Sequence, residues 1–431
     1  MMDVYILNAD LELVGIADAY KSLIWAKRYN TVGDCELYVP ATEENLALCK
    51  KGFYIMRTDD DMICQIKKIE IDTDAENGNY IVATGYDAKR LLDQRIVWGT
   101  MTANGNAETF ARNMVDGALG SAAEADRQLT DSGGNRIFGL GASAGLTDRL
   151  SEQVSYKNVG EKIREYCLKF GWGYRVKLSG GILAFELYKG ADRSAAVIFS
   201  SDYENLAATT YIEDESNMGN IALIVGEGQG SERFRCVAGE VSGAERYEIY
   251  ADARDISKSI TYEELKKLYP LSGASIVSSG GGYAYQVDSL DVPILDDGQL
   301  NWLEENYPDG SVVTVGGADY YRIADLIVAA LPSGAPEDTD SVTLEDVIYM
   351  TYLLEGGYEK MAEFGYVTSF AGIIEPNTTF AYKIDYNLGD IVTVRNALGI
   401  GAAVRIAEVI EVWDDSGYKV KPKFETITEE G

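Results

Sequence analysis

Most of the side chains in this sequence that could take part in catalysis are carboxylates. The chain has 69 Asp and Glu residues and no histidine. Without an imidazole, it lacks the Ser-His-Asp and Cys-His nucleophile systems, a histidine-bearing zinc site and a histidine general base. The catalytic arrangement that remains is a pair of carboxylic acids, as in glycosidases. Because spacing along the sequence nominates no such pair, we assign no catalytic residue.

One acidic stretch has the residue types of a calcium site. Asp72, Asp74 and Glu76 precede Gly78. An EF-hand loop needs Gly at its sixth position and Glu at its twelfth. Counted from Asp72, however, Gly78 is seventh and Ala83 twelfth. We therefore predict the solvated tip of a hairpin here, since Asn-Gly is a strong hairpin signal, and no calcium site.

The other acids and the cysteines do not predict a metal site either. Asp59-Asp60-Asp61 lies between two predicted strands, and we interpret it as a solvated turn. The five cysteines are widely spaced and include no Cys-x-x-Cys pair, so neither a disulfide framework nor a zinc site is expected. Cys167 lies on the apolar face of a predicted helix, which favours a buried free thiol. We assign no metal-binding residue.

Two glycine clusters have the composition of phosphate-binding loops but not the context. Residues 139–144 fit G-x-G-x-x-A, a fingerprint that needs a strand before it and a helix after it. Only residues 136–138 could form that strand, and no long amphipathic helix is predicted from 146–149. Residues 226–230 follow a predicted strand but have the wrong glycine spacing. We predict a surface loop and a hairpin loop, and no bound cofactor.

The net charge limits the possible partners. It is −31, from 69 acidic and 38 basic residues. Because binding to nucleic acid or to an anionic membrane needs clustered Lys and Arg, neither is expected. The first residues lack the pattern of a signal peptide, and the apolar run 326–331 is too short to span a bilayer. We expect a soluble protein made in a cytoplasm, and the length of 431 residues predicts more than one domain.

Regions with the pattern of strands lie on both sides of a mixed region. Residues 1 to about 97 predict strands and one short helix after Thr42. Further strands are predicted at 205–211, 220–225 and 245–250, and we expect them to pair with the C-terminal strands described below.

The middle of the sequence, residues 98–200, predicts a small α+β unit. Apolar residues recur at helical spacing from Val159 to Phe170, and Gly171 follows as a helix stop. A hairpin is predicted at 172–188 because two alternating segments flank a Ser-Gly-Gly turn.

The composition changes at residues 270–342. This stretch has five of the eight prolines, and twelve acids against one base. We interpret it as an insertion that decorates the outside of the molecule. Apolar residues from Ile323 to Leu331 at helical spacing predict an amphipathic helix within it. Helix starts are also predicted at two capping signals, Thr261 with Glu264 and Thr343 with Asp346.

The C-terminal region predicts an antiparallel meander. Its segments are 387–394, 405–409 and 417–424. In the last segment lysines alternate with apolar residues, which is typical of a half-buried strand. Pro422 cannot donate a ladder hydrogen bond, so this strand is expected at the edge of the sheet.

These segments and the N-terminal ones together resemble one family. The sequence is similar to the siphophage and prophage minor tail proteins of the tail hub type, also called Tal-like or baseplate-hub proteins. The resemblance covers residues 1 to about 265 and 345 to 427. The matching segments are Val4–Asn8, Ile24–Tyr29, Gly33–Pro40 and Asn387–Val394.

The resemblance implies a mainly β fold with α+β insertions, in which two barrel-like β domains of the tail hub type accompany smaller α/β domains. The expected division is an N-terminal barrel-like domain at 1–97, an α+β domain at 98–200, a second barrel-like domain at 201–264 plus 343–427, and an acidic Pro/Gly-rich insertion at 265–342.

The resemblance also implies a structural role and no enzymatic activity. Three copies would form a ring at the virion tail tip that closes the tail tube and takes part in attachment and DNA ejection. The implied neighbours are the distal tail protein, the tail tube, the tape-measure protein and a receptor-binding or fibre protein. Trimerisation would also cover exposed strand edges. The residues leave a second possibility open, a tail-tip adhesin for cell-wall glycan or a wall hydrolase that uses a carboxylate pair.

Overall fold

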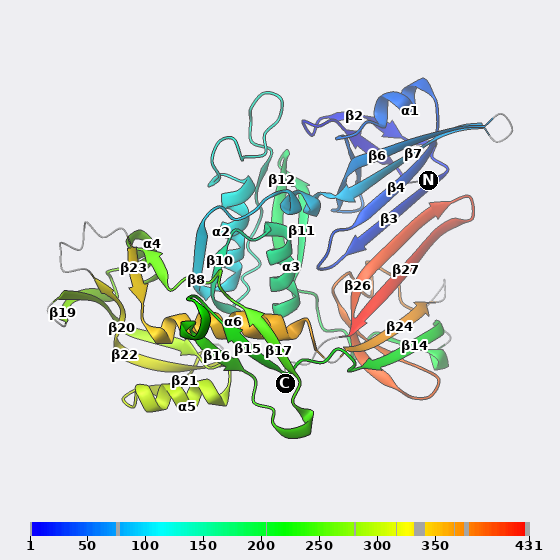
Figure 1. Cartoon of the computed structure of the whole chain (residues 1–431). Coiled ribbons are helices and arrows are strands. Elements are labelled where there is room, and N and C mark those ends of the chain that lie inside the picture. Colours follow the sequence, from blue (N-terminus) through cyan, green and yellow to red (C-terminus); the bar gives the residue numbers. More distant parts are fainter. Residues whose placement is uncertain are drawn as a thin grey trace.

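The computed structural model describes residues 2–74, 78–203, 205–279, 282–315, 317–331, 341–365, 367–374 and 379–426 (Figure 1). The chain is mainly β, with 47% of residues in strands and 20% in helices, which confirms the predicted class at this level. The described strands form six separate sheets, and none of these closes into a barrel. None of the described helices is long and apolar enough to cross a membrane.

Both ends of the chain contribute to the largest sheet, which has 11 strands. Its N-terminal part comprises β1 (Val4–Leu7), β2 (Leu13–Ala17), β3 (Ser22–Arg28), β4 (Asp34–Pro40), β5 (Tyr54–Arg57), β6 (Ile63–Asp74) and β7 (Gly78–Asp87), with helix α1 (Glu43–Leu48) after β4. Its later strands are β13 (Ile198–Ser200), β25 (Ile391–Arg395), β26 (Gly401–Asp414) and β27 (Gly417–Thr426). The strand order is β13-β25-β26-β3-β4-β7-β6-β5-β1-β2, and β27 pairs with β26.

The predicted C-terminal meander is confirmed. β25, β26 and β27 pair in antiparallel order. Among the described strands β27 pairs only with β26, so Pro422 lies on an edge strand as predicted. Pro422 is buried, whereas Lys421 and Lys423 on either side of it are exposed. β26 also pairs with β3 and places Val412 opposite Ile24, which joins the two ends of the chain.

The strands between residues 205 and 250 do not pair with this meander, which corrects the expectation from the sequence. β14 (Leu206–Asp214) pairs with β24 (Val367–Ile374). β15 (Ile221–Val225), β16 (Arg235–Ala238) and β17 (Glu248–Asp252) form a sheet of their own. Ile224 of β15 packs in one core with Tyr349 of helix α6 (Asp346–Ala362), so this sheet packs on a helix. Short 3-10 helices lie at Ser201–Tyr203, Gly230–Glu232 and Gly243–Glu245.

The helix and hairpin predicted in the middle of the chain are confirmed. This region contains the 3-10 helix η1 (Ala88–Gln94), β8 (Thr100–Asn106), α2 (Ala107–Leu119), β9 (Phe138–Leu140), β10 (Arg149–Ser155), α3 (Val159–Phe170), β11 (Gly173–Ser179) and β12 (Ile182–Tyr188). Helix α3 ends at Gly171, whose φ of 64° lies in the left-handed region that glycine adopts at little cost. Cys167 on α3 is a buried free thiol, as predicted. β11 and β12 pair as an antiparallel hairpin.

The acidic segment contains a strand where a helix was predicted. Its region comprises β18 (Ser259–Thr261), α4 (Tyr262–Leu268), β19 (Ala274–Ser279), β20 (Gly282–Pro293), α5 (Asp297–Asn306), β21 (Ser311–Val315), β22 (Ala318–Leu331) and β23 (Ser341–Leu344). Asp325, with a φ of 50°, lies where the alternation of buried and exposed residues in β22 is interrupted. Ile323, Leu326 and Val328 are therefore all buried. The spacing of three between Ile323 and Leu326 resembles the period of a helix, which explains the wrong prediction.

One of the two helix starts predicted from capping signals is confirmed. Thr261 and Glu264 form a reciprocal capping box at the start of α4. Thr343 instead belongs to β23, where it pairs with Ser259. Helix α6 begins at Asp346 without a side-chain cap bond, because its predicted cap residue is held in the strand.

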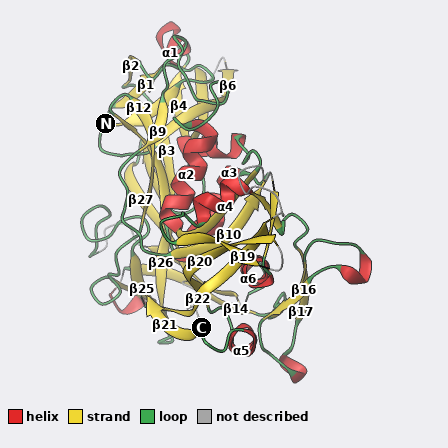
Figure 2. Ribbon diagram, turned by 90° about the vertical axis from the view of Figure 1, so that its left-hand side faces the viewer, coloured by secondary structure: helices red, strands yellow, loops and turns green. Residues whose placement is uncertain are grey.

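The acidic segment is part of a buried core, which corrects its interpretation as an outer decoration. Tyr285 of β20 and Val328 of β22 belong to the same cluster as Leu353 of α6. In both views, α2 and α3 lie between the N-terminal strands of the large sheet and the sheet that contains β20 and β22 (Figures 1 and 2). The acidic segment and the later helix α6 therefore stabilise each other by burial of apolar area.

A buried ionic cluster joins α3 to α6. Its members are Glu152 of β10, Lys162, Glu165, Tyr166 and Lys169 of α3, and Glu355 and Glu359 of α6. Lys162 contacts Glu152, and its Nζ lies 3.0 Å from Glu359. Carboxylates outnumber ammonium groups in this cluster. Burial, reinforced by the charge of Glu359, raises the pKa of Glu152 to about 7.

Replacing Glu152 with Gln should make the free energy of unfolding less dependent on pH. The pKa of Glu152 is about 7 in the folded chain, against an ordinary 4.5, so between these values the folded chain binds more protons than the unfolded chain. Stability therefore falls as pH rises, by on the order of 3 kcal/mol for this group. Denaturation by urea at about pH 5 and about pH 8 measures the difference.

The matched control for this experiment is Glu165→Gln, because Glu165 contacts the same Lys162 but is half exposed. We expect the control to keep the pH dependence of the wild type. If Glu152→Gln shows that same dependence, the assignment of a raised pKa to Glu152 is wrong.

Candidate functional site

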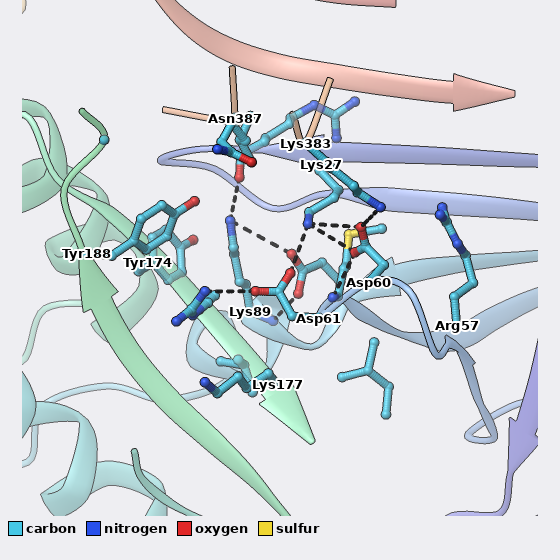
Figure 3. A pocket seen from close by; sticks show the side chains of 18 of the residues that line it. Lys27, Arg57, Asp60, Asp61, Lys89, Tyr174, Lys177, Tyr188, Lys383 and Asn387 are labelled. Atoms are coloured by element: carbon cyan, nitrogen blue, oxygen red, sulfur yellow. Dashed lines mark hydrogen bonds and ion pairs between the residues drawn. The ribbon is translucent and has the colours of Figure 1, made fainter. Parts of the chain in front are cut away.

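A cavity of about 910 Å³ lies where three parts of the chain meet (Figure 3). The first part is the turn between β5 and β6 with the end of β3, the second is β11 and the residues after β12, and the third is the segment 382–390. Nine Lys or Arg residues and five Asp residues line the cavity, namely Lys27, Arg28, Arg57, Lys89, Arg175, Lys177, Lys189, Arg193 and Lys383, and Asp59, Asp60, Asp61, Asp87 and Asp390. We call this cavity the ionic cleft.

Asp60 is the most enclosed acid of the cleft. Its side chain is fully buried, and Lys27 and Lys383 each approach it to 3.0 Å. The backbone N–H of Met62 and Nε1 of Trp25 also donate to it, over 3.0 and 3.3 Å. Burial alone would raise the pKa of Asp60, but the two lysines outweigh burial and hold the pKa at about 2. The interpretation of this turn as solvated is therefore wrong for Asp60.

The acids on either side of Asp60 are also paired. Asp61 contacts Lys27 at 2.8 Å and Arg175 of β11 at 2.9 Å, and Asp59 contacts Arg57 and Lys383. Although burial opposes it, these cations lower the pKa of both carboxyls. The acidic turn thus links the N-terminal sheet to β11 and to the C-terminal segment.

Behind this turn, Arg57 of β5 is fully buried against Glu411 of β26. The guanidinium donates to both carboxylate oxygens over 3.2 and 3.3 Å. It also lies over the ring of Trp413 at 4.1 Å and near the ring of Trp25 at 5.4 Å. A planar guanidinium suits a bidentate carboxylate contact and stacking on aromatic faces at the same time.

Asp87 and Lys89 form the buried wall of the cleft. Their charged atoms are 3.8 Å apart. Burial raises the pKa of Asp87 and lowers that of Lys89. The ammonium of Lys89 donates to the carbonyl of Thr31 over 3.1 Å and lies 4.6 Å from the centre of the Tyr174 ring. Both groups are thus occupied by contacts within the fold.

The charged side chains of the cleft hold parts of the chain together and are not arranged for acid-base catalysis. Because cations hold Asp59, Asp60 and Asp61 ionised, none of these three carboxyls carries a proton to donate near neutral pH. No group of three or more His, Cys, Asp or Glu side chains in the described ranges could hold a metal ion. No residue of the cleft was assigned a role from the sequence. The missed signal was the run of three acids opposite a strand that ends in Lys27-Arg28.

The motifs weighed in the sequence lie elsewhere. Residues 139–144 begin within the short strand β9, and the next element is the strand β10, so the helix that a dinucleotide site requires is missing at this point of the described chain. Residues 226–230 connect the antiparallel strands β15 and β16, as predicted for a hairpin loop. β6 and β7 form the predicted hairpin around Gly78, whereas Glu76 lies outside the described residues.

Replacing Asp60 with Asn should destabilise the chain by about 3 kcal/mol, because it leaves a buried ammonium group without its full charge partner. The matched control is Glu70→Gln, which breaks an ion pair with Lys68 at an exposed position of β6. We expect the control to unfold like the wild type. Denaturation curves of the three proteins measure the effect, and equal stability of Asp60→Asn and the wild type would show that the cluster contributes nothing.

Comparison with known proteins gives one family and several similar structures. The fold is similar to the tail protein from Neisseria meningitidis MC58, with 8% identity and a TM-score of 0.47 over 98% of this chain and 96% of that one. It is also similar to the 43 kDa tail protein of prophage MuSo2 from Shewanella oneidensis, with 8% identity and a TM-score of 0.47 over 98% of each chain. The prophage tail protein gp18 from Listeria monocytogenes EGD-e gives 9% identity and a TM-score of 0.47 over 100% of this chain and 95% of that one.

TM-scores below 0.5 support no conclusion about function, and no curated protein matches the chain. The family evidence is stronger, because a model described as Siphovirus ReqiPepy6 Gp37-like protein matches residues 3–424. The match confirms the resemblance to a siphophage family that the sequence indicated. The chain belongs to the Siphovirus ReqiPepy6 Gp37-like protein family.

Proposed function

We propose that this protein is a structural component of a siphophage tail tip. In this role three copies form a hub ring that closes the tail tube and connects it to the distal tail protein, the tape-measure protein and a receptor-binding or fibre protein. The observation that carries the proposal is the family match over residues 3–424. The segments at both ends of the chain that resemble tail hub proteins support it.

The charge distribution is consistent with this role. The net charge of −31 disfavours a grip on DNA, so DNA could pass a ring of such chains without being held. The ion pairs of the acidic turn in the ionic cleft join parts of the chain, which supports a structural role.

One edge of the large sheet supports self-association. β2 lies at the end of the strand order, and its other edge pairs with no described strand. Leu13, Val14 and Ile16 of β2 are exposed, with 59% exposure at Leu13. An exposed apolar edge strand is prone to pair with another chain, so neighbouring copies in a ring would cover it.

Images of the purified protein in negative stain should show three-fold rings with a central opening at high concentration. Single globules at every concentration would contradict a ring that forms without partners.

Two lysines placed on the exposed edge of β2 should weaken trimer formation, because charged side chains oppose burial of an apolar contact.

We therefore expect Val14→Lys with Ile16→Lys to raise the concentration needed for trimers by about tenfold or more. Leu398→Lys is the control, since Leu398 is exposed on the turn after β25. Mass photometry measures both variants. If the β2 variant and the control assemble alike, the edge of β2 is not an interface.

A further inference from the structure

The charges that the ionic cleft presents to solvent are mainly positive. The side chains of Asp60, Asp87 and Asp390 are at most 5% exposed. The side chains of Arg175, Lys177 and Arg193 are between 28% and 40% exposed. Three of the five acids that line the cleft are therefore buried behind the cations, although the chain as a whole carries a charge of −31.

Several donors on one wall of the cleft have unused capacity. Lys189, the residue after β12, is exposed and makes no ion pair within the described part of the chain. Arg193 contacts Asp390 through Nε over 2.8 Å, which leaves both Nη groups without a partner among the described residues. Lys177 of β11 has one carboxylate contact, at 2.9 Å to Glu186. A ligand with anionic oxygens could bind these groups without breaking the contacts of the fold.

The opposite wall restricts where such a ligand can lie. Asp59 and Asp61 are partly open, and both already contact cations. An anionic ligand is repelled by these two carboxylates and attracted by the β11–β12 wall. It should therefore lie along the hairpin and away from the acidic turn.

The spacing along the hairpin selects the kind of anion. Lys177 pairs with Ala184, whereas Tyr188, just before Lys189, pairs with Gly173. The two lysines are thus about five residues apart along the strands, which corresponds to roughly 16 Å. A chain of carboxylates spans this distance directly, whereas one phosphate or one carboxylate reaches both ammonium groups only if the two side chains extend toward each other.

We infer that the ionic cleft is a binding site for an acidic polypeptide segment of another protein, which Lys177, Lys189 and Arg193 hold through its carboxylates. This inference rests on the proposed structural role, because it names the chemistry of a partner segment at the tail tip. The volume of about 910 Å³ is enough for a few side chains of such a segment.

Binding of fluorescein-labelled hexaglutamate to the full-length chain at low salt tests the inference by fluorescence anisotropy. We expect saturable binding that weakens with added salt, and no binding of hexalysine. Lys177→Gln with Lys189→Gln should weaken binding by about tenfold or more, because two charge contacts are lost. Lys68→Gln, at an exposed position on β6, is the matched control and should bind as the wild type does.

Lys189→Glu alone keeps the test valid if the double variant unfolds, because Lys189 is exposed and unpaired in the described chain. It should weaken binding while the melting temperature stays unchanged. The inference fails if hexaglutamate does not bind, or if Lys68→Gln weakens binding as much as the cleft variants do. If inorganic phosphate binds as tightly as hexaglutamate, the site takes small anions and the polypeptide assignment is wrong.

Peptide binding and ring formation are measured separately, so the two proposals can fail independently. If the wild type forms rings but does not bind the peptide, the proposed structural role stands and this inference is overturned. Peptide binding by chains that form no ring would support the site and contradict a hub ring that forms without partners.

Discussion

The fully buried ion pair between Arg57 and Glu411 is the contact on which the architecture most depends. It joins residues that are 354 positions apart, from the N-terminal strand β5 to the C-terminal strand β26. A buried charge is costly unless its partner is present and well oriented. The bidentate geometry and the rings of Trp25 and Trp413 meet this requirement. The pairing of β26 with β3 lies beside it, so the two ends of the chain form one sheet.

Other ionic contacts connect the remaining parts in the same way. Asp60 and Asp61 join the large sheet to the C-terminal segment and to β11, and Lys162 joins α3 to α6. Such contacts are directional, so they define how neighbouring parts are oriented, whereas apolar cores mainly supply stability. With cations at these contacts, an acidic chain can fix the relative positions of segments that are far apart in the sequence. This property is suited to a component that connects neighbours in a tail.

Local features of the fold could be predicted from the sequence, and long-range ones could not. Helix α3 with its stop at Gly171, the β11–β12 hairpin and the C-terminal meander each depend on residues close in sequence. The β26–β3 pairing leaves no local pattern and was not predicted. The strands predicted between 205 and 250 were assigned to the C-terminal meander, with which they do not pair. In β22, the left-handed residue Asp325 produced a helix-like spacing. The buried state of Asp60 depends on Lys383, whose position no local pattern specifies.

The most direct test of this account is a double-mutant cycle on Arg57 and Glu411. Arg57→Met and Glu411→Leu should each destabilise the chain by about 3 kcal/mol or more, because each removes the bidentate partner of a buried charge. The double variant should be less destabilised than the sum of the two, with a coupling energy on the order of 2 kcal/mol. Additive effects in the denaturation curves would contradict the claim that this pair joins the two ends of the chain.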